Sequence, residues 1–130
     1  MEMCVLWENE AVNVMESEYL ISMLSQIRFP VQDEKECQAA IEKMLTDRCV
    51  PFQREFPLSP DDIPDFIVDN TIVVEVKVKG NAKSILKQCI RYCMHETTGT
   101  LILITNRTIG FPEEINGKPC YVIQTGRAWL

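Results

Sequence analysis

The stretch Thr100–Thr105 restricts the fold more than any other part of the sequence, because it is an almost wholly apolar strand. It reads TLILIT, with no polar residue between its two terminal threonines. A strand without alternation is typical of a sheet that is buried on both faces. The patterns at 33–48 and 82–95 have helical spacing, and Asp33 is expected to be the N-cap of the first. At 130 residues, the chain has the size of one domain, and we expect an α/β fold with helices flanking a central sheet.

Three further strands are predicted between the two helical patterns. Residues 52–56 alternate, and IPDFIV at 63–68 and TIVVEVKV at 71–78 are rich in β-branched and aromatic residues. The order is therefore helix, three strands, helix, strand, with a mixed sheet. A helical pattern at 16–28 precedes this unit and a strand at Cys120–Gln124 follows it. On the 82–95 helix, one face is expected to hold Ala82, Leu86, Cys89 and Cys93.

Two carboxylates and an ammonium interrupt the strands at 63–68 and 71–78. Asp65 and Glu75 lie on strands joined by a short turn, so both carboxylates can reach one point. Lys77 follows Glu75 by two residues, which places both side chains on one face of a strand. Hard cations such as Mg²⁺ prefer oxygen ligands, and the Val76 carbonyl offers a third oxygen. This set predicts a Mg²⁺- or Mn²⁺-dependent phosphodiesterase, with Lys77 orienting the attacking water or helping to deprotonate it.

The same residues carry a resemblance to a known family. Pro64-Asp65 followed by Glu75-Val76-Lys77 resembles the PD-(D/E)xK motif of the restriction-endonuclease-like nuclease superfamily. The predicted element order is similar to the core of that superfamily. The resemblance covers residues 33–107 as a catalytic core, with an N-terminal extension at 1–32 and a C-terminal strand extension at 108–130.

This resemblance implies the roles of particular residues. Asp65 and Glu75 are expected to bind the metal, and Lys77 is expected to be the catalytic lysine. Many members add a glutamate from the first helix, which here is Glu34 or Glu36. Glu34 is preferred, because it continues the inward stripe at positions 34, 37, 41 and 45. The implied activity is hydrolysis of nucleic acid, with DNA as the expected substrate.

The second helix carries another element of the resemblance. Gln88 and Tyr92 form Q-x3-Y, which resembles a motif in the nuclease domains of recombination helicase–nucleases. Spacing i, i+4 places them on one helical face. An amide and an aromatic ring beside a row of cations suit a phosphate backbone or an unpaired base. The predicted nucleic-acid contacts are Lys79, Lys83, Lys87, Gln88, Arg91 and Tyr92.

The charge distribution agrees with a local contact to a polyanion. The chain has a net charge of −6, and residues 1–75 carry 5 basic against 16 acidic residues. Residues 76–95 carry 5 basic residues and no acid. A concentrated basic segment on an acidic protein predicts a polyanion site. The alternative interpretation is a solvated helix face.

Other classes of site and location are less consistent with the sequence. Six cysteines form no CxxC pair and there is a single histidine, His95, which argues against zinc. Cys37, Cys89 and Cys93 are expected to be buried thiols, and His95 is expected to satisfy carbonyls at a helix end. No apolar run approaches the length of a membrane helix and no secretory signal is evident, so we expect a cytoplasmic protein that does not contact a membrane.

Two alternatives to a stand-alone nuclease remain open. One is a catalytically silent nucleic-acid-binding module, and the other is an accessory subunit of a larger DNA-processing complex. The N-terminal extension, with Trp7 and Tyr19, suits a homodimer contact or a partner in such a complex.

Overall fold

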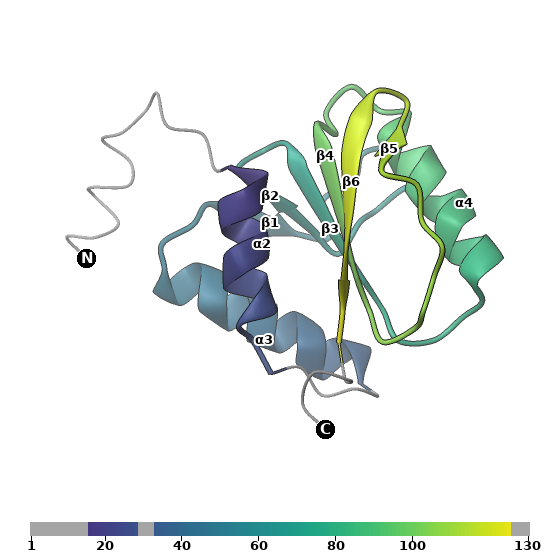
Figure 1. Ribbon diagram of the computed structural model, residues 1–130. Helices are drawn as coiled ribbons and strands as arrows, with labels where there is room; N and C mark the ends of the chain where they lie inside the picture. Colours follow the sequence, from purple (N-terminus) through teal and green to yellow (C-terminus); the bar gives the residue numbers. More distant parts are fainter. Residues whose placement is uncertain (1–15, 29–32, 126–130) are drawn as a thin grey trace.

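The structure, a computed structural model, describes residues 16–28 and 33–125. These residues form an α/β arrangement in which a mixed six-stranded sheet lies between helices (Figure 1). The described helices are α2 (Ser17–Ser25), α3 (Glu34–Asp47) and α4 (Ala82–Cys93). The strands are β1 (Phe52–Arg54), β2 (Phe66–Val68), β3 (Ile72–Lys77), β4 (Thr100–Thr105), β5 (Glu114–Ile115) and β6 (Lys118–Gln124).

The sheet combines an antiparallel half and a parallel half. Its strand order is β1-β2-β3-β4-β6-β5, in which β1, β2 and β3 pair antiparallel while β3, β4 and β6 run parallel. The predicted order of helix, three strands, helix and strand is therefore present. Several boundaries differ from the prediction, and two of them concern the predicted site: β2 begins at Phe66 and β3 ends at Lys77. Asp65 thus precedes its strand by one residue, and Lys79 lies outside the strand.

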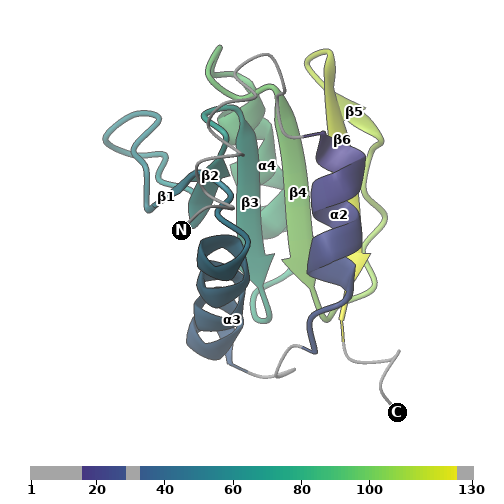
Figure 2. The same ribbon diagram turned by 90° about the vertical axis from the view of Figure 1, so that its left-hand side faces the viewer.

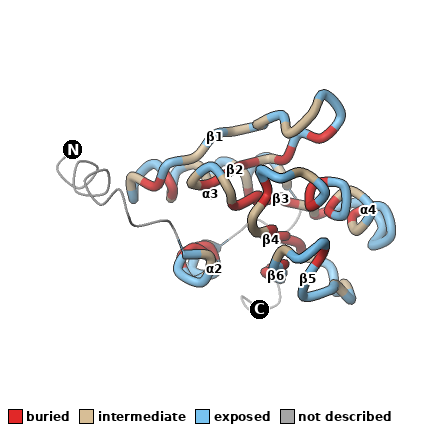
Figure 3. The backbone as a smooth tube through the Cα atoms, turned by 90° about the horizontal axis from the view of Figure 1, so that it is seen from above, coloured by how far each residue is buried: buried red, intermediate tan, exposed pale blue. Residues whose placement is uncertain are grey.

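Helices cover both faces of the sheet, as Figures 2 and 3 show. One apolar core joins α2 and α3 to the face that carries Val74, Val76 and Ile102. A second core joins α4 to the opposite face, which carries Leu101 and Leu103. The prediction that β4 is buried on both faces is confirmed, because its side chains alternate between these two cores.

Helices α3 and α4 each begin where a polar side chain accepts hydrogen bonds from free N–H groups of the first turn. Asp33 accepts hydrogen bonds from the N–H groups of Lys35 and Glu36 at the start of α3, which confirms the predicted N-cap. Asn81 accepts from the Ser84 N–H at the start of α4. These caps set the first turns of both helices, so that Glu34 is a residue of the first turn of α3.

The predicted inward face of α4 is partly wrong. The buried residues of α4 are Ile85, Cys89, Tyr92 and Cys93, while Ala82 is exposed and Leu86 is only half-buried. The helix is rotated about its axis relative to the prediction, because burying Ile85 and the ring of Tyr92 removes more apolar surface from water than burying Ala82.

The described part of the N-terminal extension belongs to the core. In α2, Leu20, Met23 and Leu24 are buried against the sheet, while Tyr19 is 52% exposed as expected. Trp7 lies outside the described residues. Among the described helices, none is long and apolar enough to span a bilayer.

The cysteines fall into two groups. Cys37, Cys89, Cys93 and Cys120 are buried thiols, which confirms the expectation for the first three. Cys49 is disulfide-bonded, and the spacing of the cysteines did not indicate this.

Candidate active site

Asp65 and Glu75 lie directly opposite each other at the end of the β2–β3 hairpin. The register pairs Phe66 with Val74, so the next pair outward is Asp65 with Glu75. The Asp65 N–H donates to Glu75 Oε1 at 3.0 Å, and the Val76 N–H donates to Asp65 Oδ2 at 2.8 Å. Each carboxylate is therefore held by the backbone of the other strand. The N–H and C=O of one strand residue point to the same side, so the Val76 carbonyl also points toward the side of Asp65.

Glu75 is a buried acid that has polar contacts with Asp65, Tyr92 and Lys77. It is 2% exposed, and its Oε1 accepts from the Asp65 N–H and from the Tyr92 hydroxyl at 3.4 Å. Burial and then the negative charge of Asp65 raise the pKa of Glu75 to about 7. Burial also raises the pKa of Asp65, although its hydrogen bond from Val76 opposes the change. The two acids therefore repel each other in a poorly solvated position.

Lys77 supplies the one ammonium that contacts this pair in the described structure. Its Nζ lies 3.2 Å from Glu75 Oε2, and its side chain is 25% exposed. Burial alone would lower the pKa of Lys77, but the charge and hydrogen bond of Glu75 outweigh it and the pKa is raised. Lys77 is therefore protonated at neutral pH. The arrangement suits a charged donor better than a group that removes a proton.

The structure distinguishes the two candidate glutamates of the first helix. Glu34 is half-buried and accepts from the Val78 N–H at 3.0 Å, just beyond the end of β3, whereas Glu36 is exposed. The charge of Glu34 also acts on Asp65 and Lys77. Among the described residues, however, no group of three or more His, Cys, Asp or Glu side chains is arranged to hold a metal ion.

The structure does not place Tyr92 on the surface, where it could stack on a base. Tyr92 is fully buried, and its hydroxyl contacts Glu75. The prediction that this ring contacts nucleic acid is therefore wrong in this conformation, since a buried ring cannot meet a base. Gln88 lies one turn earlier in α4 and is half-buried.

The predicted cations do not all face the carboxylates. Lys79, Lys83 and Lys87 are exposed. Lys87 and Lys83 lie five and nine residues before Tyr92, which corresponds to about 140° and about 180° around the axis of α4. They therefore point away from Glu75. Arg91 is exposed but its Nε lies 2.9 Å from Asp62 Oδ1, so its charge is paired.

The sequence did not indicate a role for Asp62, and the role predicted for His95 is wrong. Asp62 is buried, and its two carboxylate oxygens accept from Arg91 Nε and His95 Nε2, each at 2.9 Å. His95 thus binds a side chain instead of helix-end carbonyls, which corrects its predicted role. The i, i+4 spacing of Arg91 and His95 was the available indication, because it places both on one helical face.

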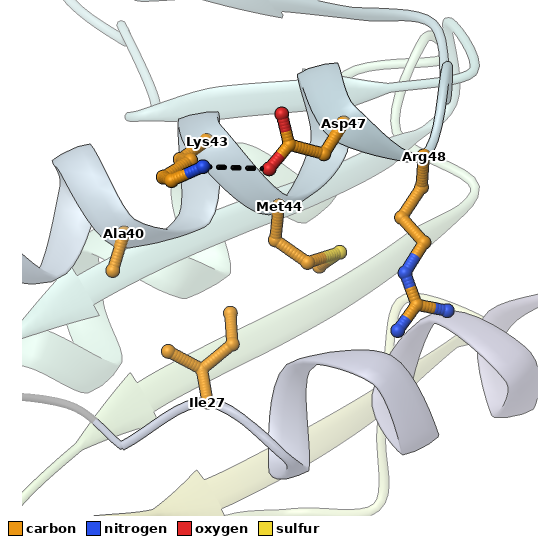
Figure 4. A pocket seen from close by; sticks show the side chains of 6 residues that line it. All are labelled: Ile27, Ala40, Lys43, Met44, Asp47 and Arg48. Atoms are coloured by element: carbon orange, nitrogen blue, oxygen red, sulfur yellow. Dashed lines mark hydrogen bonds and ion pairs between the residues drawn. The ribbon is translucent and has the colours of Figure 1, made fainter.

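A separate open hollow lies between the end of α2 and the helix α3 (Figure 4). Its volume is about 370 Å³. None of the predicted site residues lines it, and its charged pair, Lys43 with Asp47 at 2.8 Å, is exposed on one helix. The lining residues are Ile27, Ala40, Lys43, Met44, Asp47 and Arg48.

The raised pKa of Glu75 predicts a pH dependence of stability. Because the folded protein holds this proton more tightly than the unfolded chain, the stabilisation is complete below the ordinary pKa near 4.5 and is lost as pH rises to about 7. Without divalent metal, we expect the free energy of unfolding to fall by on the order of 3 kcal/mol over this range. Urea denaturation of Glu75→Gln should show most of this fall removed. The exposed control Glu36→Gln should keep it, and an unchanged fall in Glu75→Gln would contradict the assignment.

Comparisons of the chain with models of protein families, with curated proteins and with solved structures gave no match. The resemblance of Pro64-Asp65 and Glu75-Val76-Lys77 to the PD-(D/E)xK motif therefore stays a prediction from sequence. The function of the site has to follow from the contacts described above.

Proposed function

We propose that the protein is a divalent-metal-dependent nuclease of the PD-(D/E)xK type, with a restriction-endonuclease-like core, that hydrolyses phosphodiester bonds of DNA. One observation carries the proposal. Glu75 is buried and Asp65 is half-buried, the two are held against each other by backbone hydrogen bonds, and Lys77 Nζ lies 3.2 Å from Glu75. Burying two repelling carboxylates lowers stability, so the arrangement is more readily explained by function than by folding.

The donor set fits Mg²⁺ or Mn²⁺. Two carboxylates against one ammonium leave an excess of negative charge, and a divalent cation would offset it. Asp65 and Glu75 would hold the ion, with the Val76 carbonyl as a further oxygen. Glu34 is the proposed additional acid at the same end of β3. When bound, the ion supplies the Lewis acidity that phosphodiester hydrolysis needs.

The remaining chemistry belongs to side chains of this chain. The Lys77 ammonium would stand beside the scissile phosphate and stabilise the negative charge that grows on it during attack by water. Tyr92 would fix the orientation of Glu75 through its hydroxyl. The reciprocal backbone bonds would keep Asp65 in place before substrate arrives. Such preorganisation lowers the reorganisation that the reaction requires.

The exposed lysines would hold the DNA backbone away from the reacting phosphate. Lys79 follows β3 directly, and Lys83 and Lys87 lie on the outer side of α4. A DNA strand that contacts all three lysines would lie across the start of α4 and extend from there to Glu75. Gln88, on the side of α4 that also carries Tyr92, is the proposed polar contact nearest the carboxylates.

A second candidate function is a catalytically silent nucleic-acid-binding module or an accessory subunit. The observation that favours it is the direction of Lys83 and Lys87, which point away from the carboxylates. In that case binding would depend on α4 and would not require Asp65, Glu75 or a metal.

Metal binding is the first test of the proposed site. Calorimetric titration with Mg²⁺ or Mn²⁺ should show saturable binding by the wild type and its loss in Asp65→Ala. Asp61→Ala removes an exposed acid from the same loop and should bind like the wild type. Equal binding by Asp65→Ala and the wild type would remove Asp65 from the ligand set.

Catalysis is tested at Lys77. In single-turnover cleavage of plasmid, linear duplex and single-stranded DNA at saturating enzyme, Lys77→Ala should be slower by a factor on the order of 10² or more. DNA binding should change little, because the other cations remain. Lys79→Ala, an exposed lysine two residues away, should lose affinity and keep its rate. A Lys77→Ala protein that cuts at the wild-type rate would refute this mechanism.

The DNA-binding surface is tested by salt dependence. Because Arg91 is paired with Asp62, we expect two phosphate contacts from α4 and not three. The double variant Lys83→Gln, Lys87→Gln should therefore flatten the slope of log K against log salt by about 2 units. Lys35→Gln, an exposed lysine on α3, should leave the slope unchanged. An unaltered slope in the double variant would place the DNA elsewhere.

A further inference from the structure

Asp62, Arg91 and His95 form a side-chain cluster, here called the Asp62 clasp, that the proposed mechanism does not use. Asp62 Oδ1 accepts from Arg91 Nε, on the last turn of α4, and Oδ2 accepts from His95 Nε2, just past the end of that helix. The Asp62 side chain is 11% exposed although it lies in a loop. The two hydrogen bonds, with that of His95 the larger effect, lower the pKa of Asp62. Asp62 therefore stays ionised at neutral pH.

The backbone around Asp62 is closed into a tight turn. The Asp62 carbonyl accepts from the N–H groups of Leu58 and Ser59, and the Asp62 N–H donates to the Ser59 carbonyl at 3.2 Å. The Asp61 N–H also donates to Ser59 Oγ. These hydrogen bonds hold the turn together, and the clasp attaches it to the end of α4. Asp65 follows Asp62 by three residues, of which Pro64 is buried and has a fixed φ.

The C-terminal end of α4 and the residues just past it thereby support both carboxylates of the candidate site. Tyr92 lies between Arg91 and His95 in the chain and donates to Glu75. Arg91 and His95 hold the loop that leads into Asp65. The segments that carry Asp65 and Glu75 are thus both attached to the end of α4. This attachment counters the repulsion between the two carboxylates.

We propose that Asp62 is a positioning residue that sets the distance and orientation of Asp65 relative to Glu75 for metal binding. This inference rests on the proposed function, and it assigns the support of that site to a loop carboxylate outside the PD-(D/E)xK motif. It also gives Arg91 a role in holding the loop, in place of the predicted phosphate contact. Groups that orient metal ligands in this way typically change metal affinity by 10- to 100-fold.

The first test measures the positioning without any metal. The Val76 N–H reports on Asp65 because it donates to Asp65 Oδ2, and the Asp65 N–H reports on Glu75. In Asp62→Ala, amide hydrogen exchange at these two positions should be faster by about tenfold or more, while the Leu103 amide in the centre of the sheet should keep its rate. Asp61→Ala is the matched control, because it removes the same charge from the same loop without touching the clasp. Unchanged exchange at Val76 and Asp65 in Asp62→Ala would overturn the inference.

The second test measures the consequence for metal. Titration with Mg²⁺ should show about tenfold or weaker binding by Asp62→Ala, with Asp61→Ala like the wild type. Faster exchange combined with unchanged Mg²⁺ affinity would overturn the inference, since the clasp would then stabilise the loop without affecting metal binding. If the wild type binds neither Mg²⁺ nor Mn²⁺, the proposed function fails, and the exchange experiment still decides whether Asp62 positions Asp65.

A conservative pair of variants separates positioning from general stability. His95→Gln keeps a side-chain N–H that can donate to Asp62, whereas His95→Ala removes it. His95→Gln should restore wild-type exchange at Val76 and wild-type Mg²⁺ affinity, and His95→Ala should resemble Asp62→Ala. Both variants should unfold at nearly the same urea concentration as the wild type, because Arg91 and His95 are partly exposed and such pairs contribute little to stability. Equal metal affinity in His95→Ala and the wild type would argue against the clasp.

Discussion

The rest of the candidate site depends on the reciprocal hydrogen bonds between Asp65 and the β3 backbone and between Glu75 and the Asp65 backbone. The Val76 N–H donates to Asp65 Oδ2, and the Asp65 N–H donates to Glu75 Oε1. These bonds hold two carboxylates together where burial raises the pKa of each and the charge of Asp65 raises that of Glu75 further. A hairpin register shifted by one residue would turn one of the two acids to the opposite face. The β2–β3 pairing is therefore a condition for any chemistry at this position.

Helix α4 stabilises that arrangement because it packs on the face of the sheet that carries Glu75. Its buried face covers the sheet through Ile85 and Cys89, and Tyr92 extends from the same face to Glu75. Arg91 and His95 reach the loop before Asp65. The helix that the sequence indicated as a nucleic-acid contact is therefore also a support for the carboxylates. Only the side that carries Lys83 and Lys87 is left for a polyanion.

The sequence predictions that were confirmed concern interactions between residues close together in the chain, and those that were wrong concern residues far apart in it. The N-cap at Asp33, the double burial of β4 and the order of elements from α3 to β4 are confirmed, because caps and hydrophobic patterns act locally. The rotation of α4 was predicted wrongly, because Ile85 and Tyr92 compete with Ala82 and Leu86 for burial. That competition is decided by the shape of the sheet beneath the helix. The partners of Asp62 were missed for a related reason, since they lie about 30 residues away in the chain.

The sequence by itself determined which ionisable residues meet at the open end of the hairpin: the pairing of the two segments places Asp65 opposite Glu75, and a period of two sets the shared face of Glu75 and Lys77. Only the tertiary structure decided how these groups are surrounded. It buried Tyr92 beside Glu75, paired Arg91 with Asp62, and turned Lys83 and Lys87 away from the carboxylates. The physical reason is that burial and ion pairing depend on which segments pack together, and packing brings together residues that no local pattern relates.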